Sequence, residues 1–297
     1  NIKPDYSEAH KNLGITLKDL GRLDAAVDSL NQAIAIDPNY VDAHYNLAIT
    51  LKDLNQFDDA VKSYQKVLEV NPNFAQAYNN LGNLLKDLGQ TDESIKNYQK
   101  AIEINPNFAH AYNNLGNAFK DLKKLKEAVS HYEKAIEENP NFSEAHNNLG
   151  NVFKDLGELD NAINSYQKAA HLDNNQYESY YNLGVAFIQL KRFNKAIESL
   201  QTAIEINPNF AQSYNNLGSA LMSQGRLKES INYFKKALDV DAGYVYAYNN
   251  LGIALTDLGQ LKAGAKSIEK AIEIDPDFAE AHNSLGNIFK KFKKRDK

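Results

Sequence analysis

The sequence predicts an all-α protein built as a solenoid of antiparallel helix pairs, and three observations carry this prediction. Apolar and small residues recur at helical rather than alternating spacing. A repeat period between 20 and 50 residues is typical of architectures in which each unit buries its apolar face against its neighbours. All seven prolines share one period of 34 residues, at Pro4, Pro38, Pro72, Pro106, Pro140, Pro208 and Pro276.

The repeats fill almost the whole chain. Counting position 1 from Ser7, eight full repeats span residues 7–278, and each contains two amphipathic helices. Residues 1–6 match the end of a preceding repeat, and residues 279–297 match the first helix of a ninth repeat with a basic tail. Both ends therefore look cut. We expect a segment of a longer chain, with apolar ends that can associate end to end.

Fixed positions within the repeat predict the helix boundaries and the packing. Position 7 is always leucine, position 8 is glycine except at Ala48, and position 20 is always small, so the two helices of a repeat should cross closely. Glycine at position 15, such as Gly21, should end the first helix. Asp24 and its equivalents at position 18 are predicted N-caps of the second helix, which proline at position 32 should end.

The same positions resemble the tetratricopeptide repeat (TPR) over nearly the whole chain. The resemblance implies a right-handed TPR superhelix, an α-solenoid of stacked antiparallel helix pairs whose first helices line the concave face. The run Tyr-Asn-Asn-Leu-Gly-Asn is most similar to the superhelical TPR region of O-linked N-acetylglucosamine transferases and to bacterial multi-repeat TPR proteins. The signature residues of one repeat are Tyr78, Leu81, Gly82, Ser94, Tyr98, Ala101 and Pro106.

Composition and motifs exclude several classes of function. A net charge of -5 argues against a nucleic-acid-binding surface, and no apolar run is long enough to cross a membrane. The chain has no cysteine and none of the common catalytic motifs. Four of its histidines replace a packing tyrosine at position 4 of separate repeats, so we expect a structural role for them. We therefore expect no catalytic residue, metal or cofactor, and a cytoplasmic protein without a signal peptide.

Position 6 is an asparagine in every full repeat, although asparagine costs a helix about 0.6 kcal/mol relative to alanine. An amide both donates and accepts hydrogen bonds, so one amide per repeat could hold the main chain of an extended peptide. In the transferases that the chain resembles, an asparagine ladder at this position has that role. The alternatives are inheritance by repeat duplication and a hydrogen bond to a neighbouring helix. The predicted ladder consists of Asn12, Asn46, Asn80, Asn114, Asn148, Asn182, Asn216 and Asn250.

Neighbouring positions extend the predicted peptide-binding surface. Position 9 adds amides, and positions 12 and 13 add a lysine and an aspartate column whose charges nearly cancel, which also fits a solvated charge lattice. In repeats six and seven, apolar residues replace polar ones and could either receive an anchor side chain or pack on each other. These residues are Asn83, Asn117 and Asn151; Lys86 and Lys120; Asp87 and Asp121; and Tyr181, Ile188 and Met222.

The predicted function is that of a non-catalytic protein–protein interaction scaffold that binds an extended peptide along its concave face. The alternative is the substrate-recruiting arm of a larger enzyme, such as a glycosyltransferase, whose catalytic domain lies outside this chain. If the asparagines serve only the ligand, replacing Asn80, Asn114 and Asn148 with alanine should preserve or raise thermal stability.

Overall fold

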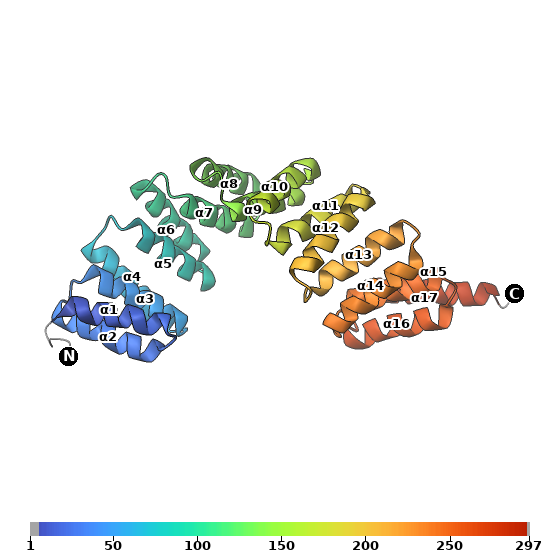
Figure 1. Cartoon of the computed structure of the whole chain (residues 1–297), viewed down its shortest axis with the longest axis horizontal. Helices are drawn as coiled ribbons and strands as arrows, with labels where there is room; N and C mark the ends of the chain where they lie inside the picture. Colours follow the sequence, from blue (N-terminus) through green and yellow to red (C-terminus); the bar gives the residue numbers. More distant parts are fainter. Residues whose placement is uncertain (1–5, 296–297) are drawn as a thin grey trace. The chain divides into compact units, whose positions relative to one another are not determined.

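The computed structural model describes residues 6–295, with side chains described as far as Lys291. The chain forms two compact units, Asn1–Pro140 and Asn141–Lys297. Figure 1 labels the helices of both units. Apart from Tyr6, the expected remnant of a preceding repeat lies outside the described residues. In the basic tail, the side chains beyond Lys291 lie outside them as well.

Both units consist of helices that alternate between first and second helices of a repeat. Unit 1 contains α1 (Ser7–Asp19), α2 (Leu23–Ile36), α3 (Val41–Asp53), α4 (Phe57–Val70), α5 (Ala75–Asp87), α6 (Thr91–Ile104), α7 (Ala109–Asp121) and α8 (Leu125–Glu138). Unit 2 contains α9 (Ser143–Asp155), α10 (Leu159–Leu172), α11 (Tyr177–Gln189), α12 (Phe193–Ile206), α13 (Ala211–Ser223), α14 (Leu227–Val240), α15 (Val245–Asp257), α16 (Leu261–Ile274) and α17 (Ala279–Arg295). The predicted all-α solenoid of stacked helix pairs is confirmed.

From α1 to α15, each first helix ends where the backbone enters the left-handed region, as predicted for position 15. Gly21 has φ 73°, and the other glycines at this position have similar values. Three repeats lack glycine there, yet Asn55, Lys123 and Lys191 adopt φ of 56–59°. Asparagine tolerates this conformation, but the turn between the two helices imposes it on the lysines as well.

The predicted N-caps of the second helices are wrong. α2 begins at Leu23 with Arg22 as its N-cap, and no side-chain hydrogen bond caps it. Asp24 lies in the first turn instead, where its carboxylate faces the positive end of the helix dipole. At the other end, α2 stops at Ile36, two residues before Pro38, as the proline predicts.

The predicted close crossing of the two helices is present in each repeat. A β-carbon added to Gly82 would lie 2.6 Å from the ring of Tyr98 and 3.2 Å from the carbonyl oxygen of Ser94. Tyr98 and Ser94 are fully buried. Glycine at position 8 therefore makes room for the residue at position 24, which fills the core between the helices.

His44, one of the position-4 histidines, and His131, at position 23, both lie against neighbouring groups of unit 1. His44 Nε2 lies 2.9 Å from the carbonyl oxygen of Pro38, the residue that ends the preceding helix. On α8, the ring of His131 stacks on Phe119, with centroids 5.1 Å apart and planes 6° from parallel. Burial lowers the pKa of His131, and nearby Glu127 opposes that shift weakly.

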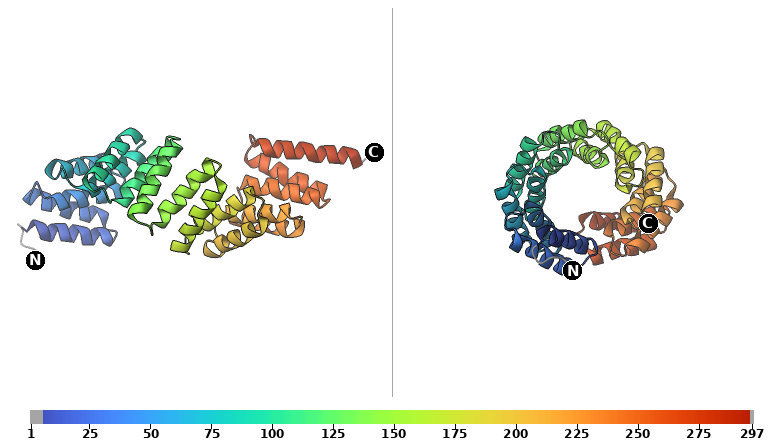
Figure 2. Two further views of the ribbon diagram at one scale, coloured as in Figure 1. Left: turned by 90° about the horizontal axis from the view of Figure 1, so that it is seen from above. Right: turned by 60° about the vertical axis from the view of Figure 1, so that its left-hand side comes forward.

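Within each unit the first helices form the inner side of the stack. In unit 1, α1 contacts α3 and α5 contacts α7; in unit 2, contacts run from α9 through α11, α13 and α15 to α17. Consecutive second helices in the described residues make at most marginal contact with each other. Each unit therefore curves with its first helices on the concave side, as the right-hand view in Figure 2 shows.

Candidate peptide-binding surface

The position-6 asparagines lie on the first helices, and several of them donate a hydrogen bond to the preceding first helix. Asn114 Nδ2 donates to Asn79 Oδ1 at 2.9 Å, and Asn80 Nδ2 donates to the hydroxyl oxygen of Tyr45 at 2.8 Å. Unit 2 repeats this pattern, from Asn182 to Asn147, from Asn216 to Tyr181 and from Asn250 to Asn215. In these repeats, the side chain at position 6 therefore donates a hydrogen bond to the side chain at position 5 of the preceding repeat.

This inter-repeat hydrogen bond was one of the alternatives left open by the sequence. The acceptor side chains Asn79, Asn147 and Asn215 are more than nine-tenths buried, so the bond satisfies an atom that water cannot reach easily. Asn46 is different, because position 5 of the preceding repeat is Lys11, which cannot accept. Asn46 Nδ2 instead donates to the carbonyl oxygen of Asp42 in its own helix at 2.8 Å.

These bonds use only one of the two N–H groups of each position-6 amide that donates them. Each position-6 side chain from α3 to α15 is half-buried, and its nitrogen carries a second hydrogen. The Oδ1 atoms of Asn80 and Asn216 accept from the adjacent Asn79 and Asn215.

The other position-6 asparagines differ in whether their Oδ1 atom accepts a hydrogen bond and in how far the side chain is exposed. For Asn114, Asn182 and Asn250, no hydrogen bond to Oδ1 is found within residues 6–295. Asn12 is exposed, and Asn148 is half-buried on α9.

The position-9 asparagines have an internal role that the sequence analysis missed. The buried hydroxyls of Tyr98, Tyr132 and Tyr166 donate to Asn83, Asn117 and Asn151 Oδ1 at 2.8, 2.7 and 2.9 Å. Burial also raises the pKa of the Tyr98 phenol. The sequence does hold a signal, because among the full repeats position 9 is asparagine only where position 24 is tyrosine, whereas Val185 accompanies Leu200.

Two lysines of the position-12 column pair with the position-13 aspartate of the next repeat. Lys52 lies 3.6 Å from Asp87, and Lys86 lies 3.2 Å from Asp121. These pairs are solvent-exposed, so each contributes at most about 1 kcal/mol. The geometry therefore matches the charge lattice that the sequence left as an alternative; Lys120 lies half-buried in the same column.

The apolar residues of repeats six and seven pack into the unit 2 core. The ring of Tyr181 meets Phe210 edge-on at a centroid distance of 5.0 Å, and burial raises the pKa of its phenol. Ile188 packs against the core cluster that contains Phe187 and Leu217. Met222 packs against the cluster around Phe234. All three side chains are half-buried, so packing explains them without an anchor pocket.

The described residues contain no group of three or more His, Asp or Glu side chains arranged to hold a metal ion. Likewise, no helix in that part of the chain is both long and apolar enough to cross a membrane.

Comparison with known proteins decides the family. A TPR-type sequence profile, described as the cilia and flagella-associated protein 70 C-terminal domain, matches residues 69–286, which is more than half of the chain. Profiles described as TPR repeat and tetratricopeptide repeat match residues 16–54 and 41–74. The chain belongs to the TPR family. The finer resemblance to O-linked N-acetylglucosamine transferases stays a prediction.

Solved TPR structures resemble the chain over different lengths. YrrB, "a TPR protein with an unusual peptide-binding site", is 27% identical and covers 63% of this chain and 96% of its own, with a TM-score of 0.54. MamA is 30% identical and covers 56% of this chain and 97% of its own, with a TM-score of 0.52. A chain of the APC/C hetero-tetramer Cut9–Hcn1 is 16% identical, covers 90% of this chain and 52% of its own with a TM-score of 0.65, and so supports the fold alone. No curated protein sequence matches.

Proposed function

We propose that this TPR chain is a non-catalytic scaffold that binds an extended peptide along its first helices, through hydrogen bonds between the peptide main chain and the position-6 amides. One observation carries the proposal. The amides of Asn114, Asn182, Asn216 and Asn250 are half-buried, and after the inter-repeat bond is made each nitrogen keeps a second N–H. The peptide-binding site named for YrrB, which is 27% identical, supports the same class of ligand.

The amides divide into two kinds by their free atoms. Asn114, Asn182 and Asn250 can donate to a peptide carbonyl and also accept from a peptide N–H. The oxygens of Asn80 and Asn216 already accept one hydrogen bond from a neighbour, so each has only one lone pair left for a peptide N–H. Hydrogen bonds of this kind are independent of the peptide's side chains, so the surface should tolerate many sequences.

The ligand side of the proposal can be tested without altering the protein. A peptide array supplies a binding sequence, and fluorescence anisotropy then compares that peptide with N-methylated and alanine-scanned copies. Each N-methyl group on a bonded residue should weaken binding about 5-fold, the equivalent of one hydrogen bond of about 1 kcal/mol. Alanine substitutions should have smaller effects. If affinity followed the side chains and ignored N-methylation, the proposal would be wrong.

A matched pair of protein variants tests the same surface. Asn46→Ala removes one amide without cutting an inter-repeat bond, since Asn46 bonds only its own helix. It should weaken peptide binding a few-fold and leave the melting temperature nearly unchanged. Asp59→Ala on the second helix α4 is the control, because Asp59 is exposed and its ion pair is with Lys62 of the same helix. Equal peptide affinity in both variants would contradict a role for the position-6 row.

A further inference from the structure

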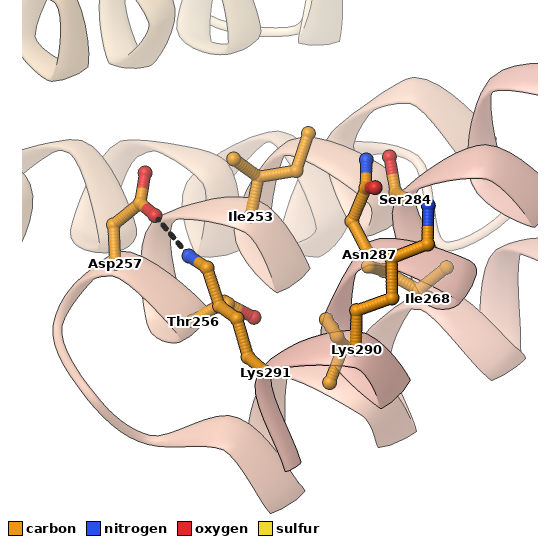
Figure 3. Close-up of a pocket in the computed structure, with 9 residues that line it drawn as sticks. Ile253, Thr256, Asp257, Ile268, Ser284, Asn287, Lys290 and Lys291 are labelled. Atoms are coloured by element: carbon orange, nitrogen blue, oxygen red, sulfur yellow. Dashed lines mark hydrogen bonds and ion pairs between the residues drawn. The ribbon is translucent and has the colours of Figure 1, made fainter. Parts of the chain in front are cut away.

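The position-6 row of amides stops beside a cleft in unit 2. This cleft, about 390 Å³ in volume, lies between the first helices α15 and α17 with α16 beneath it (Figure 3). Ile253, Ile268 and Ile288 form its apolar part, and Ser284, Asn287 and Lys290 contribute from α17.

Three substitutions in the repeat pattern open this cleft. Position 24 is tyrosine in repeats two to five but Ile268 here. Position 6 is asparagine in all eight full repeats but Ser284 on α17. Position 12 is lysine from α1 to α9 but Thr256 on α15. Each change replaces a larger side chain with a smaller one, and Ile268, Ser284 and Thr256 all line the same cleft.

The row of inter-repeat hydrogen bonds also ends here. Asn249 is the position-5 residue that precedes Ser284, and it is 7% exposed. Its Oδ1 is buried and accepts no hydrogen bond from the described residues. In the equivalent place Asn215 accepts from Asn250. Ser284 therefore leaves both an empty volume and an unsatisfied acceptor, which points to a local departure from the structural pattern of the other repeats.

The walls of the cleft define the chemistry of an occupant. Ile268 is fully buried and Ile288 nearly so, which makes the floor aliphatic. Figure 3 shows Ser284, Asn287 and Lys290 on one side of the cleft and the Asp257–Lys291 ion pair, 3.1 Å long, on the other.

The charges on the rim add a second preference. Lys291 is paired with Asp257, whereas Lys290 is exposed and has no ion pair among the described side chains. The rim thus carries one uncompensated positive charge, unlike the paired columns of unit 1.

We infer that this cleft is a side-chain subsite that takes a branched aliphatic residue of the bound peptide, with an acidic residue next to it that meets Lys290. The inference rests on the proposed function for the delivery of the peptide. The main-chain hydrogen bonds give affinity without sequence preference. The cleft selects which residue of the peptide lies beside α17, where the position-6 row of amides ends. An aliphatic side chain buries its own surface in the cleft, chiefly against Ile253, which is only half-buried. A neighbouring carboxylate complements the lysine.

The test uses the full chain with isoleucine methyl groups labelled for NMR. The probes are acetyl-Ala-Leu-Glu-Ala-amide and two copies, one with leucine changed to alanine and one with glutamate changed to glutamine. Saturable shifts are expected for the methyl groups of Ile253, Ile268 and Ile288. The alanine copy should bind about 10-fold more weakly, and the glutamine copy about 3-fold more weakly. Equal binding of all three peptides would overturn the inference.

Two variants control for the place of binding. Ser284→Asn restores the residue found in the other repeats; it should narrow the cleft, supply a donor for Asn249 and weaken the methyl shifts while the melting temperature rises. Ser219→Asn makes the same change on α13, outside the cleft, and should leave the shifts intact. Unchanged peptide binding in Ser284→Asn would refute the subsite.

The outcome also separates this subsite from the function on which it rests. Asn46→Ala lies in unit 1 and reports on main-chain binding alone. If the tetrapeptide shifts the three methyl groups while long peptides ignore both N-methylation and Asn46→Ala, the subsite stands and the proposed main-chain function fails. If long peptides respond to both but the tetrapeptide has no effect, the subsite fails and the proposed function stands.

Discussion

Asn114→Ala separates the structural role of the position-6 amides from their proposed role in binding. The substitution removes the 2.9 Å hydrogen bond to Asn79 Oδ1 and leaves that acceptor unsatisfied in a side chain that is 6% exposed. Losing such a bond costs about 1 to 3 kcal/mol. Alanine returns about 0.6 kcal/mol through its higher helix propensity. We therefore expect the free energy of unfolding to fall by about 1 to 2 kcal/mol, contrary to the expectation from sequence alone.

Asn46→Ala is the matched control. It gains the same helix propensity, and it loses only the exposed bond to the carbonyl oxygen of Asp42 within one helix. Its stability should lie within about 0.5 kcal/mol of the parent chain.

Urea denaturation followed by circular dichroism measures both variants, and hydrogen exchange of α5 and α7 shows whether the loss is local. A double-mutant cycle with Asn79→Ala should give a coupling of about 1 kcal/mol between Asn79 and Asn114. If Asn114→Ala proved as stable as Asn46→Ala, the inter-repeat bond would have no energetic value, and the asparagines would be retained for another reason.

Three further predictions follow from packing and exposure. Burial lowers the pKa of His131 and favours its neutral form. The stability that it contributes is therefore full above the unfolded pKa of about 6.5 and falls as the pH drops through the lower folded pKa. In His131→Ser, the melting temperature should depend less on pH below pH 6.5. Gly82→Ala should destabilise the chain by about 1 to 2 kcal/mol because a β-carbon meets Tyr98 at 2.6 Å, whereas Gly286→Ala, where nothing lies within 4 Å, should stabilise it by up to about 1 kcal/mol, both read from urea denaturation. Phe289 is 54% exposed on α17, so Phe289→Ser should reduce any concentration-dependent growth in mass seen by light scattering; growth unaffected by the change would place self-association elsewhere.

Sequence reasoning was reliable wherever one residue position has a local physical consequence. The period of 34, the leucine at position 7 and the proline at position 32 predicted the helix pairs, because helix periodicity and helix breaking act over a few residues. Glycine at position 15 predicted the turn, although Lys123 shows that the turn does not require glycine. The prediction of the N-caps was wrong because it relied on the preference of aspartate for this position. The preceding turn starts α2 at Leu23, one residue before Asp24.

The sequence by itself determined that the chain is a stack of amphipathic helix pairs with an amide at one position of every full repeat. Only the tertiary structure decided what those amides do, because Asn114 and its acceptor Asn79 are 35 residues apart and meet only when two repeats are stacked. The sequence contains the correlation between asparagine at position 9 and tyrosine at position 24. Only the structure shows that Asn83 and Tyr98 face the same interior space and form a hydrogen bond. Hydrogen bonds between repeats depend on distances across a packed interface, and a helix pattern specifies the face of a residue but not the atom opposite it.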